Sequence, residues 1–434
     1  MKKIERFVRG GFVNYYSTDK LVEVPEKVKE KDEEVRGIWF STVANIDMAV
    51  MDNADDLKAY LLGVIKKVKE YHFNTIVFQV RPTNDAFYKS ELNPWSRFIT
   101  GQEDKDPGFD VFGWFIDEAK KENIEVHAWI NPYRVSNVKF SENFKTKDEF
   151  LDSLSEKNFA RRNKDLVIET VLDKCILDPA SVEVQEFVSD SALEIAENYD
   201  VKAIHIDDYF YPYEALRDPE EETKWKRISP NLSLDDWRRE NVDKLMKMIS
   251  DKLKTLDKKV EFGISPFGIY RTNSKHFATF GKKGGWEKGS HNHYSCYQGY
   301  EGLFADVYLW MEKGWIDYVV PQVYFEFDNY IIDKETGEEV ERVKYADLVD
   351  WWSWACKETN MKLYIGQGLY RYSDKGNWSN SEEIINQLKY NHTKDNISGQ
   401  VMFTYRNLVR DDIPALVEAR KKLKEFWTKD VKPI

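Results

Sequence analysis

Two adjacent carboxylates, Asp207 and Asp208, are the strongest candidates for chemistry in this sequence. They follow an apolar run that ends at Ile206 and precede an aromatic segment, YFYP, that begins at Tyr209. Like charges this close raise the pKa of one partner, which suits proton transfer near neutral pH. Most acidic pairs are solvated loop residues or helix caps, but a position at the end of a buried strand favours a catalytic role.

Glu326 is the third carboxylate that we predict to act in catalysis. It lies in the segment PQVYFEF, at the end of an apolar run that begins at Asp317. Because side chains alternate along a strand, Gln322, Tyr324 and Glu326 point to the same side if the strand continues that far. The competing interpretation is a glutamate at the rim of the fold with no chemical role.

Further polar and aromatic residues end the other apolar runs, and we predict that they bind the substrate. Histidines inside apolar runs are as often hydrogen-bonded structural residues as ligand contacts. The arginines could hold a substrate through planar guanidinium forks, or could hold the acidic centre in place. The predicted substrate-binding residues are Gln79, Arg81, His127, Trp129, Asn131, Tyr133, Arg134, His205, Tyr209, Ser265, Gln322, Tyr324, Tyr405 and Arg406.

Eight short β-rich runs alternate with amphipathic helical patterns along the chain. In the helical patterns apolar residues recur every three or four positions, as at Leu57, Leu61 and Val64. This alternation predicts an α/β fold, a (β/α)8 TIM barrel, whose catalytic residues lie at the C-terminal ends of the strands. The expected strands begin at Arg36, Asn74, Glu125, Lys202, Val260, Asp317, Lys362 and Gly399.

The chain is longer than such a barrel requires. A TIM barrel typically has about 250 residues, and this chain has 434. We expect a single domain over residues 35–428, after an N-terminal extension over 1–34, with enlarged βα loops at the C-terminal face. Aromatic residues make up 15% of the chain; part of them are expected in the core and on helix faces, and another part gather at the predicted strand ends and in these loops. Insertions are expected near 136–178, near 270–300 and near 328–344, where Gly337 marks a hairpin turn.

Charge and cysteine content argue against several classes of protein. The formal net charge of −12 disfavours a nucleic-acid partner, which needs a concentrated positive field. The three cysteines are scattered, and His291 and His293 lack a third ligand nearby, so we expect no disulfide framework, metal or cofactor.

Targeting signals are also missing from the sequence. No apolar run is long enough to cross a membrane. The N-terminal residues contain no apolar core of a signal peptide, so we expect a cytoplasmic location for this sequence, and export if it is a trimmed form of a longer chain. The oligomeric state is left open.

Carboxylates combined with aromatic platforms indicate sugar chemistry. Two mechanisms are open. In the first, Asp208 or Asp207 is the nucleophile and Glu326 the acid/base. In the second, the aspartate pair acts alone and the N-acetyl group of the substrate is the nucleophile. The rival interpretations are a non-catalytic carbohydrate-binding barrel and a barrel enzyme that acts on phosphorylated metabolites.

Six segments in chain order carry a family resemblance: RGIWFSTVANID, FNTIVFQVRPTNDAFY, DPGFDVFGWFIDEAKKENIEVHAWINPYR, IHIDDYFYP, FGISPFGIYR and DYVVPQVYFE. From about Val35 to about Asn407 the chain resembles the glycosyl hydrolase-like 10 family. The resemblance implies a bacterial (β/α)8 barrel with glycosidase activity. One characterised type in this family cuts peptidoglycan glycan strands stripped of their stem peptides. The implied partner is therefore a glycan, expected to be an amino-sugar-containing cell-wall oligosaccharide, with a neutral oligosaccharide as the alternative.

Overall fold

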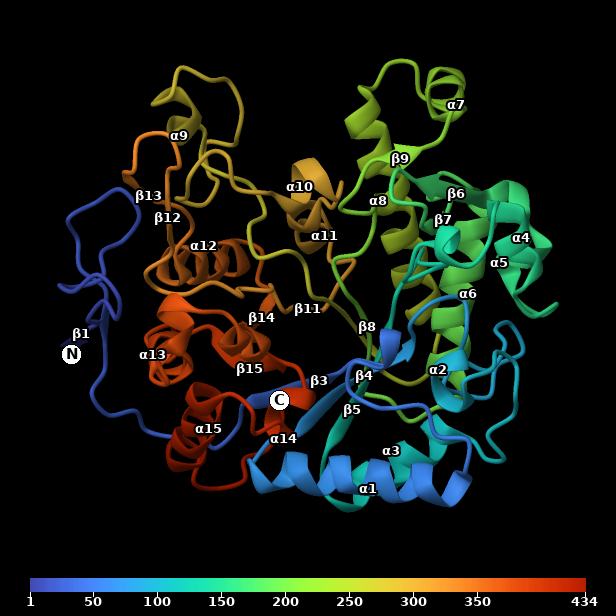
Figure 1. Cartoon of the computed structure of the whole chain (residues 1–434), viewed down its shortest axis with the longest axis horizontal. Coiled ribbons are helices and arrows are strands. Elements are labelled where there is room, and N and C mark those ends of the chain that lie inside the picture. The colour runs from blue at the N-terminus through green and yellow to red at the C-terminus, as the bar shows by residue number, and fades with distance from the viewer.

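The computed structural model describes residues 1–434 and contains a closed barrel of eight parallel strands. Each strand pairs with its neighbours in chain order, and the last strand closes the barrel by pairing in parallel with the first. The predicted (β/α)8 fold is therefore confirmed, and all eight expected strands form (Figure 1). The barrel strands are β3 (Val35–Phe40), β4 (Thr75–Arg81), β5 (Glu125–Ile130), β8 (Ala203–Ile206), β10 (Glu261–Ile264), β11 (Tyr318–Val319), β14 (Lys362–Gly368) and β15 (Ile397–Phe403).

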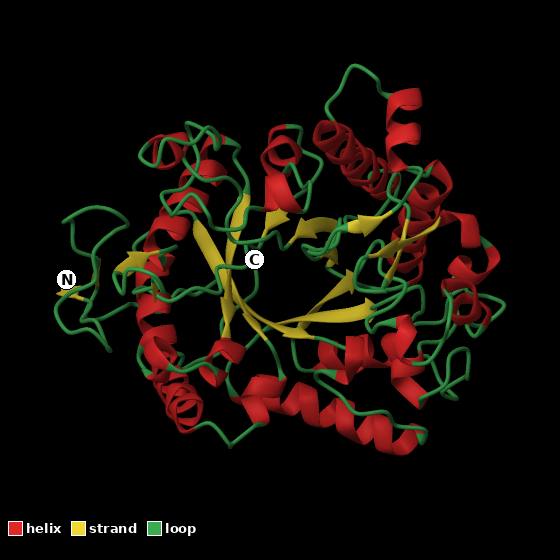
Figure 2. Ribbon diagram, turned by 45° about the horizontal axis from the view of Figure 1, so that its top comes forward, coloured by secondary structure: helices red, strands yellow, loops and turns green.

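Helices surround the barrel and cover the outer face of its strands (Figure 2). Side-chain caps start several of them: Asn53 accepts the backbone N–H groups of Asp55 and Asp56, and Ser181 accepts that of Val184. None of the helices combines the length and the apolar character that a membrane crossing requires. The outer helices are α1 (Ala54–Glu70), α3 (Val111–Lys121), α6 (Val182–Asn198), α8 (Leu234–Leu253), α11 (Val307–Glu312), α12 (Tyr345–Glu358), α13 (Glu383–Asn391) and α15 (Pro414–Phe426).

The interior of the barrel is filled by inward-facing side chains that form a cluster separate from the outer core. Tyr318 of β11 lies in this interior and is fully buried. Gly263, on the neighbouring strand β10, makes room for it, because a Cβ atom at this position would lie 1.8 Å from the Tyr318 ring. The interior cluster consists of Val35, Trp39, Val77, Trp129, Ala203, Tyr318, Val320, Tyr364 and Val401.

Several βα connections carry additional elements, and three of them are long insertions at the positions where the sequence predicts them. The first builds α4 (Lys147–Asp152), α5 (Phe159–Arg162), β6 (Val167–Thr170) and β7 (Cys175–Leu177). Here β6 pairs with β7 and with β9 (Leu216–Arg217), which lies in the next connection. The second contains α9 (Ser274–Ala278) and α10 (Gly299–Gly302), and the third contains the hairpin of β12 (Tyr330–Ile332) and β13 (Glu339–Glu341). The remaining short strands and α-helices are β1 (Lys2–Lys3), β2 (Glu23–Val24), α2 (Arg97–Thr100), α7 (Glu221–Ile228) and α14 (Arg406–Val409).

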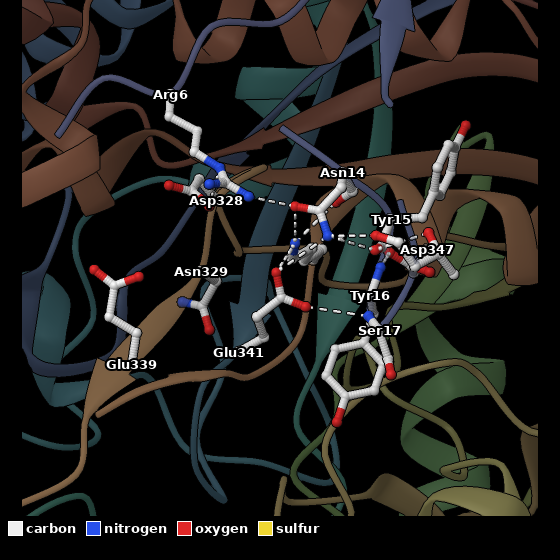
Figure 3. Close-up of polar contacts among 12 residues, drawn as sticks. Arg6, Asn14, Tyr15, Tyr16, Ser17, Asp328, Asn329, Glu339, Glu341 and Asp347 are labelled. Atoms are coloured by element: carbon white, nitrogen blue, oxygen red, sulfur yellow. Dashed lines mark hydrogen bonds and ion pairs between the residues drawn. The ribbon is translucent and has the colours of Figure 1, made fainter. Parts of the chain in front are cut away.

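The N-terminal segment lies against the third connection and α12. Glu341 of β13 accepts hydrogen bonds from the Asn14 side chain at 3.3 Å and from the backbone N–H of Ser17 at 3.1 Å (Figure 3). The backbone N–H of Tyr16 donates to Asp347 of α12 at 3.0 Å. Through these contacts residues from the start of the chain hold elements that lie more than 300 positions later in the sequence.

Replacement of Gly263 by alanine tests the packing of the barrel interior. The added Cβ overlaps the Tyr318 ring, so we expect Gly263→Ala to lower the free energy of unfolding by about 1–3 kcal/mol or more. Gly63→Ala is the matched control: Gly63 lies on the exposed face of α1 with no atom near the new Cβ, so this change stabilises the helix by about 0.5–1 kcal/mol. Urea unfolding curves of both variants check the expectation. A Gly263→Ala protein as stable as wild type contradicts it.

Candidate functional site

A cavity of about 430 Å³ opens at the C-terminal ends of the barrel strands, and both Asp207 and Asp208 line it. We call it the strand-end cavity. Its volume falls within the range of about 300–1,000 Å³ that is typical of small-ligand sites. The wall is rich in aromatic side chains, namely Trp39, Trp129, Tyr209, Tyr213, Phe267, Tyr324, Phe325, Tyr370 and Phe403.

Asp207 is held in one orientation by donors from two neighbouring strand ends. Its Oδ1 accepts the Asn131 side-chain amide at 3.0 Å and the backbone N–H of Tyr209 at 3.1 Å. Its Oδ2 accepts the indole N–H of Trp129 at 3.1 Å. Burial raises the pKa of Asp207, while Arg134 and these donors oppose the rise. The result is a buried carboxylate whose position is fixed by the protein.

The environment of Asp208 favours the protonated form more strongly than that of Asp207 does. Burial, and then the adjacent charge of Asp207, raise the pKa of Asp208 to about 6. The hydroxyl of Tyr213 donates to its carboxylate and partly offsets this rise. Asp208 therefore retains a proton at pH values where an exposed aspartate is ionised.

A chain of hydrogen bonds in the barrel interior supports the floor of the cavity. The Tyr318 hydroxyl contacts Nδ1 of His127 at 2.8 Å and Nδ1 of His205 at 3.0 Å. Nε2 of His205 contacts the hydroxyl of Ser265 at 3.0 Å, and Ser265 lines the cavity. Burial lowers the pKa of His127 to about 3 and that of His205 well below its usual value, so both rings are neutral. The two histidines do not line the cavity; they are buried in the barrel interior, and their ring nitrogens bond to Tyr318 and Ser265.

Several predicted substrate-binding residues do come together around the aspartate pair. The amide of Gln79 is oriented by its Oε1, which accepts the backbone N–H groups of Thr42 at 3.0 Å and Val43 at 2.9 Å. Gln322 donates to the backbone carbonyl of Ser265 at 2.9 Å. The predicted residues that line the cavity are Gln79, Trp129, Arg134, Tyr209, Ser265, Gln322 and Tyr324.

Glu326 lies outside the strand-end cavity, because the strand that would place it on the same side as Gln322 and Tyr324 does not continue that far. The strand β11 already ends at Val319, and the consecutive residues Tyr324 and Phe325 both line the cavity. The alternation of a strand is therefore lost before Glu326 is reached. Its carboxylate accepts the indole N–H of Trp378 at 2.8 Å and the side-chain amide of Asn329 at 2.9 Å.

Arg81 also lies away from the cavity, because the register between β4 and β5 shifts between Gln79 and Arg81. After this bulge Arg81 pairs with Ile130, which belongs to the outer core. Its buried guanidinium donates to the backbone carbonyl of Asn131 at 2.7 Å and lies over the Phe187 ring.

The remaining predicted residues lie in three other places. Tyr405 is buried in the outer core against Phe40, because the chain leaves strand geometry after Phe403. The Arg406 side chain is exposed and does not line the cavity. Asn131 and Tyr133 line a smaller neighbouring pocket.

Trp39, Tyr213 and Phe403 line the cavity and were not predicted from the sequence. A signal exists for two of them: Trp39 and Phe403 are the inward-facing residues at the ends of their strands, next to outward-facing Phe40 and Met402. For Tyr213 the signal is the continued run of aromatic residues after Asp208. No group of three or more His, Cys, Asp or Glu side chains is arranged to hold a metal ion.

The fold agrees with a comparison against known families. Residues 34–381 match the family model described as Glycosyl hydrolase-like 10, and the chain belongs to this family. It is 31% identical to the glycosyl hydrolase YngK of Bacillus subtilis over 420 residues, which cover 95% of this chain and 75% of YngK. It is 30% identical to the glycosyl hydrolase DigH of Escherichia coli K12 over 401 residues, which cover 87% of this chain and 84% of DigH.

Among solved structures, α-L-fucosidase isoenzyme 2 from Paenibacillus thiaminolyticus is similar to this chain with a TM-score of 0.51 and 10% sequence identity. The similar region covers 91% of this chain and 50% of the fucosidase, so the chain spans about half the length of that protein. At this identity the likeness concerns the barrel fold alone.

The raised pKa of Asp208 predicts how stability depends on pH. A carboxyl whose pKa is about 6 when folded and about 4 when unfolded destabilises the folded state as pH rises through this interval. Asp208→Asn removes this effect, so we expect the variant to gain about 1–3 kcal/mol of unfolding free energy relative to wild type at pH 8, and little at pH 4. Urea unfolding at both pH values measures the difference. A gain that is equal at the two pH values contradicts the assignment.

Proposed function

We propose that the protein hydrolyses O-glycosidic bonds in an amino-sugar-containing bacterial cell-wall glycan of the peptidoglycan type. The observation that carries this proposal is the buried pair Asp207 and Asp208 at the floor of an aromatic cavity, with the pKa of Asp208 raised to about 6. Membership of the glycosyl hydrolase-like 10 family and the names of YngK and DigH support the class of reaction. The choice of glycan follows from the family resemblance and from the mechanism below.

In the proposed mechanism Asp208 is the general acid. Its raised pKa keeps a proton available near neutral pH, and it donates this proton to the leaving glycosidic oxygen as the bond breaks. After departure of the leaving group, the Asp208 carboxylate accepts a proton from the attacking water. The same residue thus serves as acid and base in turn.

Asp207 is proposed to orient the acetamido group of the substrate. An ionised carboxylate has about four acceptor sites, and Asn131, Trp129 and the Tyr209 backbone occupy three of them. The remaining site can accept the acetamido N–H. The acetamido carbonyl oxygen is then held below the anomeric carbon, where it acts as the nucleophile of a substrate-assisted reaction.

The aromatic wall fits a carbohydrate ligand. Flat aromatic faces pack against the apolar faces of pyranose rings, and tyrosine and tryptophan add polar groups at the ring edge. Trp39 packs edge-on against Tyr324 with ring centroids 6.3 Å apart, and Tyr324 packs edge-on against Tyr370 at 5.6 Å. These mutual contacts hold the wall rigid, so little side-chain freedom is lost when a sugar binds.

Activity measurements on purified glycan strands test the proposal. We expect Asp208→Asn to lower kcat by about 10²–10⁴-fold, the usual contribution of a general acid, and Asp207→Asn to lower it by a similar factor because the acetamido group is no longer oriented. Glu326→Gln is the matched carboxylate-to-amide control, and we expect it to retain kcat within a few-fold because Glu326 lies outside the cavity. A loss for Glu326→Gln as large as that for Asp208→Asn would falsify the assignment.

A thiazoline that mimics the cyclised acetamido intermediate distinguishes the substrate-assisted route from a covalent glycosyl-enzyme. We expect it to bind wild type at least about 100-fold more tightly than the parent sugar, as transition-state analogues do, and to lose this advantage in Asp207→Asn. Calorimetry measures both affinities. Efficient hydrolysis of matched sugars that lack the acetamido group would rule the route out.

A further inference from the structure

A second pocket, of about 210 Å³, lies directly beside the strand-end cavity. We call it the side pocket. The two share Val43, Arg134 and Tyr209, so a ligand that occupies the cavity can extend a substituent into the side pocket. Its volume is below the range of about 300–1,000 Å³ that encloses a whole small ligand. It therefore suits a substituent of a sugar rather than a further length of chain.

Arg134 stands at the junction of the two spaces, and its guanidinium forms no direct ion pair with a carboxylate of the protein, although its charge favours the ionised form of Asp207 nearby. Its guanidinium is half-buried, donates to the backbone carbonyl of Pro82 at 3.1 Å, and lies 4.4 Å from the centre of the Tyr209 ring. The guanidinium forms no ion pair, although 41 ion pairs are formed elsewhere in the chain. Arginine cannot lose its proton in a protein, and most of its five N–H donors are left without a protein acceptor.

The balance of charge in the side pocket selects the kind of anion. Arg134, Lys174 and Glu214 are its only charged lining residues, and Lys174 already pairs with Glu214 at 3.4 Å. Among the lining residues of the side pocket, Arg134 is therefore the one charge without an ion-pair partner. A single carboxylate matches it, whereas a phosphate monoester carries about −1.5 to −2 at neutral pH.

The side pocket also has a buried polar group that lacks a partner. Tyr133 is fully buried and lines the pocket, and its hydroxyl makes no hydrogen bond within the protein. Buried polar groups are nearly always paired in folded proteins. An oxygen-bearing substituent that reaches this hydroxyl supplies the missing acceptor.

We propose that the side pocket binds a carboxylate substituent on the sugar seated over Asp207 and Asp208, with Arg134 as the charged anchor. The inference rests on the proposed function, since it places an acidic amino sugar at the reacting centre. It defines the substrate class further: a glycan whose ring beside the cleaved bond carries a monoanionic side group. A glycan without this group binds through the aromatic wall alone.

Calorimetric binding tests the proposal without turnover. The protein carries Asp208→Asn to block hydrolysis, and the probes are a tetrasaccharide of alternating N-acetylglucosamine and N-acetylmuramic acid and the same tetrasaccharide with its carboxylates converted to amides. We expect the carboxylate form to bind about tenfold or more tightly than the amide form, as expected for a charge-assisted hydrogen bond. Addition of Arg134→Gln abolishes this preference, and Arg134→Lys retains part of it.

Arg227→Gln is the matched control, because Arg227 is an exposed arginine of α7 outside both spaces. It is expected to leave the preference intact. Equal affinity for the two tetrasaccharides, absence of binding to either by the folded protein, or a preference that survives Arg134→Gln overturns the inference. Tighter binding of a phosphorylated tetrasaccharide than of the carboxylate form also contradicts it.

Turnover by the protein without Asp208→Asn, measured in parallel, separates this inference from the proposed function. Binding that depends on Arg134, with no hydrolysis of either tetrasaccharide, supports the side pocket and refutes the hydrolase. Hydrolysis of both forms at equal kcat/KM, with an equal effect of Arg134→Gln on each, supports the hydrolase and refutes the side pocket.

Discussion

The burial of two adjacent carboxylates at the end of β8 is the constraint on which the site depends. A buried, unpaired charge is costly, and two beside each other are more so, yet Asp207 and Asp208 are both nearly inaccessible to solvent. The fold stabilises the charged forms of the two carboxylates to different extents. Asp207 accepts hydrogen bonds from Trp129, Asn131 and the backbone of its own loop. Asp208 lies beside the charge of Asp207 and keeps its proton to higher pH. The asymmetry provides one oriented acceptor and one acid in neighbouring positions.

Packing and hydrogen bonds in the barrel interior fix the strand ends beneath Asp207 and Asp208. Gly263 leaves space for the Tyr318 ring, and the Tyr318 hydroxyl joins two neutral histidines to Ser265 at the cavity floor. The polar chain is buried and paired, so it fixes the strand ends without adding charge near the aspartates. The long βα connections then build the surroundings of the cavity, including the side pocket, where Arg134 forms no direct ion pair. Rigid strands thus position the two aspartates, and loops build the walls of the spaces around them.

Apolar runs and helical periodicity were sufficient to predict the eight strands, because parallel barrel strands are buried on both faces. The aspartate pair could also be predicted, since it immediately follows the buried residues of β8. Errors arose where strand geometry ends. A bulge carries Arg81 out of the interior, and β11 stops before Glu326, so alternation no longer describes either residue. The inward-facing histidines were ambiguous from sequence because their role depends on Tyr318, which lies more than 100 residues later. Such long-range contacts leave no local pattern.

The titration of Asp208 tests the central claim most directly. Carbon-detected NMR of protein with labelled aspartate carboxyl groups, assigned through Asp208→Asn, follows this one group between pH 3 and 9. We expect a midpoint near pH 6 in the wild type, and a lower midpoint in Asp207→Asn, where the neighbouring charge is absent. A wild-type midpoint near 4, the value of an exposed aspartate, would show that burial beside Asp207 does not prepare Asp208 to act as an acid.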